Sequence, residues 1–294
     1  MRELTFSADG NRCAASMFGN VMVLDVGKQT VYQVIPTDIG GNTVLNFDGT
    51  LLAAVGNWTW KPGRDGQVEV WRTLDGGLLY RNKLSNVRSM ALDAGGSYVA
   101  IAQPTQVLKI DLDRATSPSV FELGGQIRVS AFSPDAQFFA CNLSDQSILL
   151  IHDLRECRRK HAFQAGQLDL IAYSPDSTIV AAASADYAIH LWDTEAVGRF
   201  SRTLRGHSRQ VTDIQISRDN QTLMSKSTNG MIRLWRVQDG FPICALRDFP
   251  LRTVFSPDGR TFAHIQRKRQ WVGHFLDLTF RPDEGEVKIW RVNV

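Results

Sequence analysis

A histidine, an aspartate and a serine lie within twenty residues of one another in the last third of the chain. His207, Asp213 and Ser225 are the residue types of a hydrolase triad, in which the histidine takes the proton of the serine hydroxyl. A triad is defined by the geometry of its members around an accessible nucleophile, and the sequence has no nucleophile elbow, phosphate-binding loop or Walker lysine. We therefore favour a structural role for these side chains and predict no catalytic residue and no cofactor.

The other histidines and the cysteines do not suggest a metal site. The histidines at positions 152, 161, 190, 264 and 274 have no partner at the spacing of zinc ligands, so we expect them in the core or on the surface. The cysteines at positions 13, 141, 157 and 244 form no Cys-x-x-Cys pair. We predict that no metal is bound and that the thiols are reduced, as in a cytoplasmic protein.

Seven short turns recur along the chain. The elements that they connect must position the histidine, serine, aspartate and cysteine side chains described above. They are Ser7-Ala8-Asp9-Gly10, Phe47-Asp48-Gly49, Asp93-Ala94-Gly95, Ser133-Pro134-Asp135, Ser174-Pro175-Asp176, Ser217-Arg218-Asp219 and Ser256-Pro257-Asp258-Gly259. From one turn aspartate to the next the intervals are 39, 45, 42, 41, 43 and 39 residues. Such a period indicates one supersecondary unit that is repeated seven times.

Short runs rich in Val, Ile, Leu, Ala and Phe flank each turn. In the best-formed unit they cover residues 168–173, 178–184 and 188–192, and a weaker fourth run follows in most units. Their length and composition are typical of β-strands. Four strands per unit, with no long helical period, predict an all-β radial array.

The third run ends in the same way in four of the units, at Trp71, Trp192, Trp235 and Trp290. With Gly206-His207 at the start of the sixth unit, these residues make the chain similar to the WD40-repeat family over essentially its whole length. The sequence diverges from the family pattern in the other three units, where Leu24, Ile110 and His152 replace the tryptophan. The resemblance implies one domain, a seven-bladed β-propeller, with blades at approximately 1–36, 37–82, 83–124, 125–164, 165–205, 206–247 and 248–294.

The resemblance also implies a structural network. In WD40 blades the strand-end tryptophan belongs to a hydrogen-bonded set with an acidic residue six positions earlier, and a buried indole N–H needs such a partner. The implied pairs are Asp65 with Trp71, Asp186 with Trp192, Asn229 with Trp235 and Glu284 with Trp290. In the sixth blade the implied set is His207, Ser225, Asn229 and Trp235, buried between strands.

Length, charge and hydropathy exclude other classes of protein. The 294 residues suit one closed propeller, and no run approaches the roughly 20 apolar residues of a membrane span. Residues 1–5 lack an apolar signal segment. A formal net charge of +3 is too small to indicate nucleic-acid binding. We expect a cytoplasmic protein that does not bind membranes, and nucleic acid is not the favoured partner.

Two blades carry insertions between their second and third strands. The turn aspartate and the end of the third strand are 15 to 17 residues apart in five blades, but 23 in the second and 32 in the seventh. In the family's topology both insertions lie on one face, on either side of the first blade. Aromatic side chains beside Arg and Lys are typical anchors of protein interfaces. We therefore predict partner binding by Trp58, Trp60, Lys61, Arg64, Arg267, Lys268, Arg269, Trp271 and Phe275.

A second interpretation of the insertions is that their aromatic residues fold back and cap the core of the propeller. Leu276, Leu278 and Phe280 alternate as the residues of a short strand would. Trp58 and Trp60 are two residues apart and would share one face of an extended strand. The sequence leaves both interpretations open.

A basic patch is predicted on the opposite face. The connections between the third and fourth strands of the adjacent blades 4 and 5 carry Arg155, Arg158, Arg159, Lys160, Arg199 and Arg202. Such a patch suits an acidic protein or a phosphate backbone. An ordinary solvated turn is the favoured interpretation, because binding of single strands also uses interleaved aromatic residues.

The last blade is predicted to lack its outer strand. Propellers of this family usually close with an N-terminal strand, yet residue 1 lies at the first strand of blade 1 and the chain stops four residues after Trp290. The strand at 287–291 would then have an unpaired edge. Three explanations stay open: a larger protein of which this chain is a piece, a strand donated by a partner, or a three-stranded blade.

The resemblance implies a non-catalytic scaffold that binds a protein or peptide, because most members of the family do so. The alternative is a sensor or targeting propeller of a larger signalling or defence assembly, in which a partner or a missing segment completes blade 7. A propeller hydrolase or lactonase with a metal in its central channel and a nucleic-acid binder are weaker alternatives.

Overall fold

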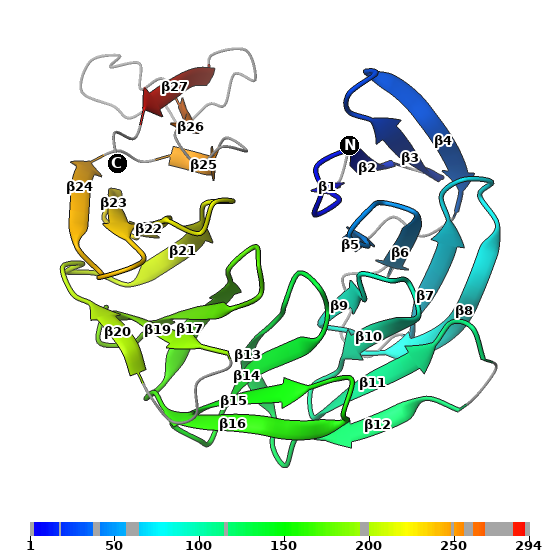
Figure 1. Cartoon of the computed structure of the whole chain (residues 1–294), viewed down its shortest axis with the longest axis horizontal. Helices are drawn as coiled ribbons and strands as arrows, with labels where there is room; N and C mark the ends of the chain where they lie inside the picture. Colours follow the sequence, from blue (N-terminus) through cyan, green and yellow to red (C-terminus); the bar gives the residue numbers. More distant parts are fainter. Residues whose placement is uncertain are drawn as a thin grey trace, which may run out of the picture.

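Seven antiparallel sheets surround a common axis, as the blades of a propeller do (Figure 1). The computed structural model describes residues 3–17, 19–37, 42–56, 65–114, 117–194, 200–247, 250–255, 261–267 and 285–291. In these ranges the chain forms the strands β1 to β27 and no helix. The predicted all-β, seven-bladed fold is confirmed.

The strands follow one another sheet by sheet. Sheet 1 contains β1 (Glu3–Phe6), β2 (Arg12–Met17), β3 (Asn20–Asp25) and β4 (Thr30–Pro36), and sheet 2 contains β5 (Asn42–Leu45), β6 (Leu51–Gly56), β7 (Asp65–Arg72) and β8 (Leu78–Ser85). Sheet 3 contains β9 (Ser89–Leu92), β10 (Tyr98–Ala102), β11 (Gln106–Asp111) and β12 (Ser119–Glu122), and sheet 4 contains β13 (Ile127–Phe132), β14 (Phe138–Leu143), β15 (Ile148–Asp153) and β16 (Arg158–Gln164). Sheet 5 contains β17 (Leu168–Tyr173), β18 (Ile179–Ser184), β19 (Ile189–Asp193) and β20 (Phe200–Leu204), and sheet 6 contains β21 (Val211–Ile216), β22 (Thr222–Ser227), β23 (Met231–Arg236) and β24 (Pro242–Arg247). Sheet 7 contains β25 (Pro250–Phe255), β26 (Thr261–Arg267) and β27 (Gly285–Arg291).

Each sheet is hydrogen-bonded in chain order, with its first strand nearest the axis and its last strand at the rim (Figure 1). In the described residues sheet 7 has three strands, as expected, and β27 is its rim strand. Because neighbouring strands are antiparallel, the connection between strands two and three leaves the same face as the link to the next sheet. We call this the insertion face. The opposite face carries the connections between strands one and two and between strands three and four, and we call it the turn face.

The same tight turn joins the first two strands in each of the six four-stranded sheets. The N–H of its fourth residue donates to the carbonyl oxygen of its first residue over 2.8–3.2 Å. The fourth residue has a φ between 55° and 76° in all six turns, and these residues are Gly10, Gly49, Gly96, Ala136, Ser177 and Asn220. Three of the six are glycine, which adopts this left-handed conformation without steric cost.

The first residue of this turn is buried and holds the start of the second strand. Its side-chain oxygen accepts the N–H of the residue five positions later, over 2.7–3.0 Å, in all six sheets. These first residues are Ser7, Asn46, Asp93, Ser133, Ser174 and Ser217. Where the residue is serine, its hydroxyl also donates to the aspartate two positions later, over 2.5–2.6 Å. The repeated Ser-x-Asp pattern therefore encodes a local hydrogen-bond set that fixes the hairpin.

The third turn lies two residues away from its predicted alignment. The sequence pattern pairs Asp93 with the turn aspartates, but the structure places Asp93 at the first position, where the other turns have serine or asparagine. The Asp93 carboxylate accepts the N–H of Tyr98 at 2.7 Å, so it replaces the serine hydroxyl. Gly95 then occupies the aspartate position. The prediction that Asp93 is the turn aspartate of this unit is wrong.

Turns of different sheets also contact one another on the turn face. The N–H of Asp9 donates to the carbonyl oxygen of Phe47 at 3.0 Å, which connects sheets 1 and 2. Arg218 of sheet 6 donates through Nη2 to the carbonyl oxygen of Ala8 at 3.0 Å. The second contact joins two sheets that are not consecutive in the chain.

The hydrophobic core lies between neighbouring sheets. The middle strand β14 is buried at all six positions, so both of its faces are covered. Phe139 of this strand packs in one cluster with Phe121 of sheet 3, and Ala140 packs in another with Trp192 of sheet 5. Each sheet therefore depends on both of its neighbours for burial of its apolar side chains.

The structure predicts that Ser174→Ala destabilises the fold by about 1 to 3 kcal/mol, because the N–H of Ile179 loses its acceptor and Asp176 loses a donor. Urea denaturation followed by circular dichroism measures the change. Ser144→Ala, at an exposed loop position, is the matched control and should leave the free energy of unfolding nearly unchanged. Equal midpoints for the two variants would contradict the role of the turn.

Candidate functional site on the insertion face

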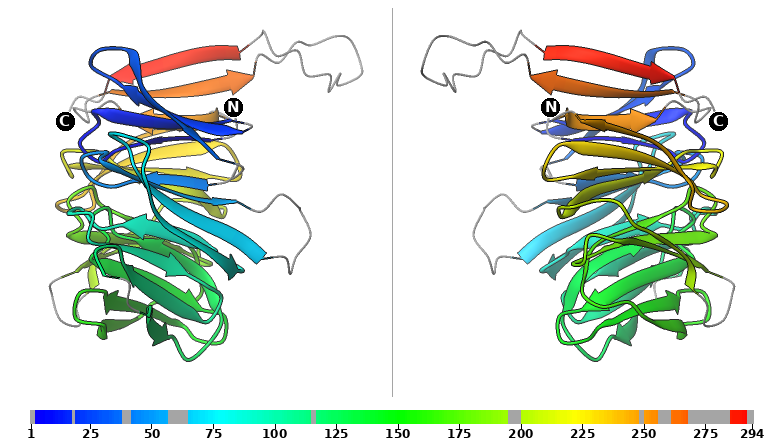
Figure 2. Two further views of the ribbon diagram at one scale, coloured as in Figure 1. Left: turned by 90° about the vertical axis from the view of Figure 1, so that its right-hand side faces the viewer. Right: turned by 90° about the vertical axis from the view of Figure 1, so that its left-hand side faces the viewer.

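Both insertions begin and end on the insertion face. The first runs from Gly56, at the end of β6, to Asp65, at the start of β7, and the second from Arg267, at the end of β26, to Gly285, at the start of β27. Figure 2 shows these strand ends, in blue and in orange and red, on the same side of the ring. Trp58, Trp60, Lys61, Arg64, Lys268, Arg269, Trp271 and Phe275 lie outside the described residues. The described part of the site is therefore its frame.

Two β-bulges set charged side chains at this face. The ladders of β13 and β17 each shift register near their start, at Arg128 and Asp169 respectively. A bulge redirects the side chain of its extra residue. Arg128 donates through Nη2 to Asp169 Oδ1 at 2.8 Å and through Nε to the carbonyl oxygen of Leu168 at 3.0 Å. An ion pair thus joins sheets 4 and 5.

Gln210, just before β21, extends this contact to a third sheet. Its Nε2 donates to Asp169 Oδ2 at 3.1 Å. The Asp169 side chain is 13% exposed, whereas Arg128 and Gln210 are exposed residues. We call Arg128, Asp169 and Gln210 the cross-blade chain. The Asp169 carboxylate accepts a hydrogen bond on each of its two oxygens. The Arg128 guanidinium and the Gln210 amide that donate these bonds are exposed to solvent.

The cross-blade chain was absent from the predicted site, although the sequence contains a signal for it. Arg128, Asp169 and Gln210 are spaced 41 and 41 residues apart. This spacing falls within the repeat intervals of 39 to 45 residues, so polar residues one repeat apart in successive units were candidates for contact between blades.

A second ion pair on the insertion face links sheet 5 to the segment that enters sheet 6. Arg205 Nη1 lies 3.2 Å from Asp186 Oδ2. Burial raises the pKa of Asp186, but hydrogen bonds, including that from the Ala188 N–H, and the Arg205 guanidinium hold it below its usual value. Asp186 therefore remains ionised, and its carboxylate accepts the N–H of Ala188 within the turn between β18 and β19.

A fully buried serine connects His207 with Trp235 in sheet 6. Ser225 Oγ accepts a hydrogen bond from Trp235 Nε1 at 2.8 Å and lies 2.7 Å from His207 Nε2. The hydroxyl is closed to solvent, and no contact among the described residues joins His207 to Asp213. The three residues of the apparent triad do not form a catalytic arrangement here.

Asn229, the expected fourth member, lies outside this set. Its Oδ1 accepts from Ser227 Oγ at 2.6 Å and from the N–H of Met231 at 3.3 Å, and its Nδ2 donates to Ser208 Oγ at 3.4 Å. The side chain closes its own turn between β22 and β23, so it cannot also reach the histidine. The expectation that Asn229 completes the set is not met.

The other implied pairs are described only in part. Trp192 is fully buried and stacks on Phe163 with ring centroids 6.0 Å apart, and Trp71 is buried in sheet 2. Asp65 and Trp290 are described by their backbone alone, as the first residue of β7 and as a residue of β27. Glu284 lies outside the described residues.

His207 is neutral in the folded protein. Burial, and to a smaller extent the nearby Arg233 guanidinium, lower its pKa to about 4. Its Nδ1 is buried and has no hydrogen-bond partner among the described residues. The hydrogen bond to Ser225 therefore holds an uncharged imidazole ring. Protonation of this ring would place a second positive charge close to the Arg233 guanidinium.

The basic patch lies on the turn face, around the turn between β15 and β16. Arg155, Arg158 and Arg159 are exposed, and Lys160 lies with Nζ 4.5 Å from the centroid of the Phe138 ring. Arg158 forms an ion pair with Glu156. Arg202 belongs to β20, and Arg199 lies outside the described residues. Part of the charge of this patch is thus already offset within its own turn.

Within the described ranges, no three His, Cys, Asp or Glu side chains converge as metal ligands would. The same ranges contain no helix with the length and hydrophobicity required to cross a bilayer.

Comparison with known proteins identifies the repeat. The family model "WD domain, G-beta repeat" matches residues 166–193 and 198–236, which contain strands β17 to β23. The chain carries WD40 repeats in a propeller fold. Among solved structures, Hsv2 of Kluyveromyces lactis superimposes with a TM-score of 0.69 over 98% of this chain and 98% of its own, at 12% sequence identity. That similarity concerns the fold alone.

Curated relatives of the WD40 propeller match over shorter stretches. The nuclear distribution protein nudF of Aspergillus flavus is 36% identical over 128 residues, 43% of this chain and 25% of nudF. The COMPASS component SWD3 of Saccharomyces cerevisiae is 25% identical over 49% of this chain and 47% of SWD3, and the small ribosomal subunit protein RACK1 of Caenorhabditis elegans is 37% identical over 22% of each. The matched part spans a quarter of nudF and less than half of the other two. WD40 proteins are in general scaffolds for protein interactions.

Removing the buried hydroxyl should destabilise the WD40 propeller without altering its surface. We expect Ser225→Ala to lower the free energy of unfolding by about 1 to 3 kcal/mol, because the Trp235 N–H loses its acceptor in the core. Urea denaturation measures this change, and Thr228→Ala, an exposed position in the turn between β22 and β23, is the control. An unchanged midpoint for Ser225→Ala would show that the network contributes nothing.

Acid should destabilise the protein through His207. Its pKa is about 4 when folded and 6.5 in the reference state, so the unfolded chain binds the proton first. The contribution of His207 to the free energy of unfolding is therefore fully present above pH 6.5 and is lost as the pH falls toward 4. In His207→Gln, the loss of stability between about pH 7.5 and about pH 4.5 should be smaller than in the parent, as measured by urea denaturation at each pH. An identical loss in both proteins would contradict the buried neutral ring.

Proposed function

We propose that this propeller is a non-catalytic interaction scaffold that binds a protein or peptide through the insertion face. The observation that carries the proposal is the position of the strand ends Gly56, Asp65, Arg267 and Gly285 on one side of the ring (Figure 2). The two insertions that they delimit hold Trp58, Trp60 and Trp271 among arginines and lysines. Rigid aromatic residues beside arginine are the residue types that contribute most to binding energy at protein interfaces.

The described frame supports a docking role for this face. The cross-blade chain exposes Arg128 and Gln210 on the insertion face, and hydrogen bonds to Asp169 hold both of them in place. Polar groups that are already ordered lose little conformational entropy when a partner binds. Enzymatic function has no support from the apparent triad, because Ser225 is buried. The cytoplasmic location remains a prediction, with all four cysteines present as free thiols.

A second candidate function is that of a sensor or targeting propeller in a larger assembly. The three-stranded sheet 7 favours it, because β27 has no further strand beside it in the described residues. A partner segment added at this edge would complete the sheet by β-augmentation. In this case an added peptide, and not the insertion face, would provide the main contact.

Comparing two variants would separate these functions. We expect Trp58→Ala, Trp60→Ala, Trp271→Ala to keep the circular dichroism spectrum of the parent and to lose specific partners in affinity capture from native lysate with mass spectrometry. The control is Arg155→Ala with Arg158→Ala, on the turn face, which should retain the same partners.

Equal capture by the triple variant and the parent would contradict the scaffold function of the insertion face. Loss of the folded spectrum in the triple variant would show that the three tryptophans belong to the core and would contradict the proposal equally.

A further inference from the structure

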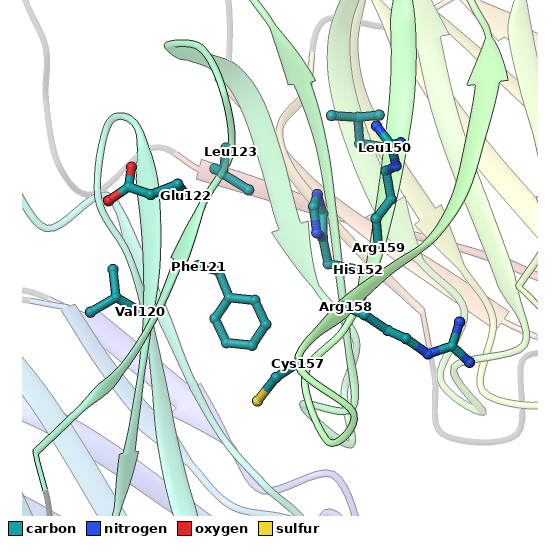
Figure 3. Close-up of a pocket in the computed structure, with 9 residues that line it drawn as sticks. All are labelled: Val120, Phe121, Glu122, Leu123, Leu150, His152, Cys157, Arg158 and Arg159. Carbon is teal, nitrogen blue, oxygen red and sulfur yellow. The ribbon is translucent and has the colours of Figure 1, made fainter.

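A cavity of about 420 Å³ opens at the rim of the propeller, between sheet 3 and sheet 4 (Figure 3). We call it the rim pocket. One side is the rim strand β12, and the other is formed by β15 and the turn that leads into β16. The volume falls within the roughly 300 to 1,000 Å³ of small-molecule sites. None of the elements that form it carries a predicted binding residue of the insertions.

The floor and one wall of the rim pocket are apolar. Phe121, Leu123 and Leu150 line it, and all three are buried. Successive side chains of a strand point to opposite faces, and Figure 3 shows Phe121 turned into the space between the sheets while Val120 and Glu122 point away from it. The Glu122 carboxylate, on a strand that lines the pocket, is thus directed away from the cavity.

A buried polar atom in the pocket lacks a partner. His152 lines the pocket and is 7% exposed, and its Nε2 is buried with no hydrogen-bond partner among the described residues. Burial, and to a smaller extent the Arg159 guanidinium, lower the pKa of His152 to about 4. A buried polar group without a partner is unfavourable and is usually explained by a ligand, a water or a functional role.

A single uncompensated cation stands beside this histidine. Arg159 pairs with His152 in the ladder between β15 and β16, and no described side chain forms an ion pair or hydrogen bond with its guanidinium. Arg158 differs, because it is paired with Glu156 and points away from His152 in Figure 3. One guanidinium without a partner and an apolar floor therefore meet in one cavity, beside a buried imidazole nitrogen that has no partner among the described residues.

We propose that the rim pocket binds a small amphipathic carboxylate, with its carboxylate group on Arg159 and His152 and its apolar chain on Phe121, Leu123 and Leu150. A carboxylate carries one charge, which matches the single free guanidinium and accepts its planar array of donors. A phosphate dianion would leave charge uncompensated in a site with one cation. A neutral ligand would leave Arg159 without its counterion.

Hexanoate is the probe, titrated into the full chain and followed by protein NMR. We expect saturable shifts of residues in β12, β15 and β16, and binding weaker by about tenfold or more for hexanol and for inorganic phosphate, since each lacks one half of the ligand. Hexanol or phosphate binding as tightly as hexanoate would overturn the assignment. So would the absence of shifts at the highest soluble hexanoate concentration.

Paired variants test which groups hold the carboxylate. Arg159→Gln, at an exposed position, should weaken hexanoate by about tenfold or more, whereas Arg158→Gln should change it by less than about twofold. His152→Leu removes the unpartnered nitrogen and should also weaken hexanoate while hexanol is unaffected. Equal effects of the two arginine variants would overturn the role of Arg159, and the free energy of unfolding of each variant, measured in urea, reports whether the fold is intact.

Discussion

A hydrogen bond from a backbone N–H to a buried side chain five residues earlier is the interaction on which the rest of this propeller depends. It recurs in six sheets, with serine, asparagine or aspartate as the acceptor. Since a slip of one residue would turn every side chain of a strand to the other face, the bond fixes which residues enter the core. The middle strands, such as β14, are buried on both faces and tolerate no such slip.

The fold could be predicted because this turn leaves a visible pattern of Ser, Asp and Gly at one period, and because apolar runs of strand length follow it. The pattern fails where a different residue performs the same task, as the Asp93 carboxylate does for the serine hydroxyl. Asn229 was misassigned for a related reason, since a short polar side chain can bond within its own turn as well as across strands. Contacts made by long side chains over one full period, such as Arg128 with Asp169, left a signal only in their spacing.

The polar groups of the propeller fall into three arrangements with different consequences. In the His207, Ser225 and Trp235 set, two side chains share one buried hydroxyl, and the result is stability. In the cross-blade chain, a held carboxylate orders exposed groups from two other sheets, which suits a docking surface. In the rim pocket, His152 Nε2 and the Arg159 guanidinium have no partner among the described residues, which suits a ligand. The sequence predicted Arg158 and Arg159 of this pocket as part of a basic patch. It did not predict the cavity, because the walls come from separate sheets and their packing has no periodic signature.

Native-state hydrogen exchange at the six turn amides tests the central claim most directly. The amides are those of Arg12, Leu51, Tyr98, Phe138, Ile179 and Thr222. If the side-chain acceptor fixes each hairpin, these amides exchange as slowly as the ladder amides of the buried middle strands, because they open only when the sheet opens. Fast exchange at these six positions, with the middle strands still protected, would contradict the account.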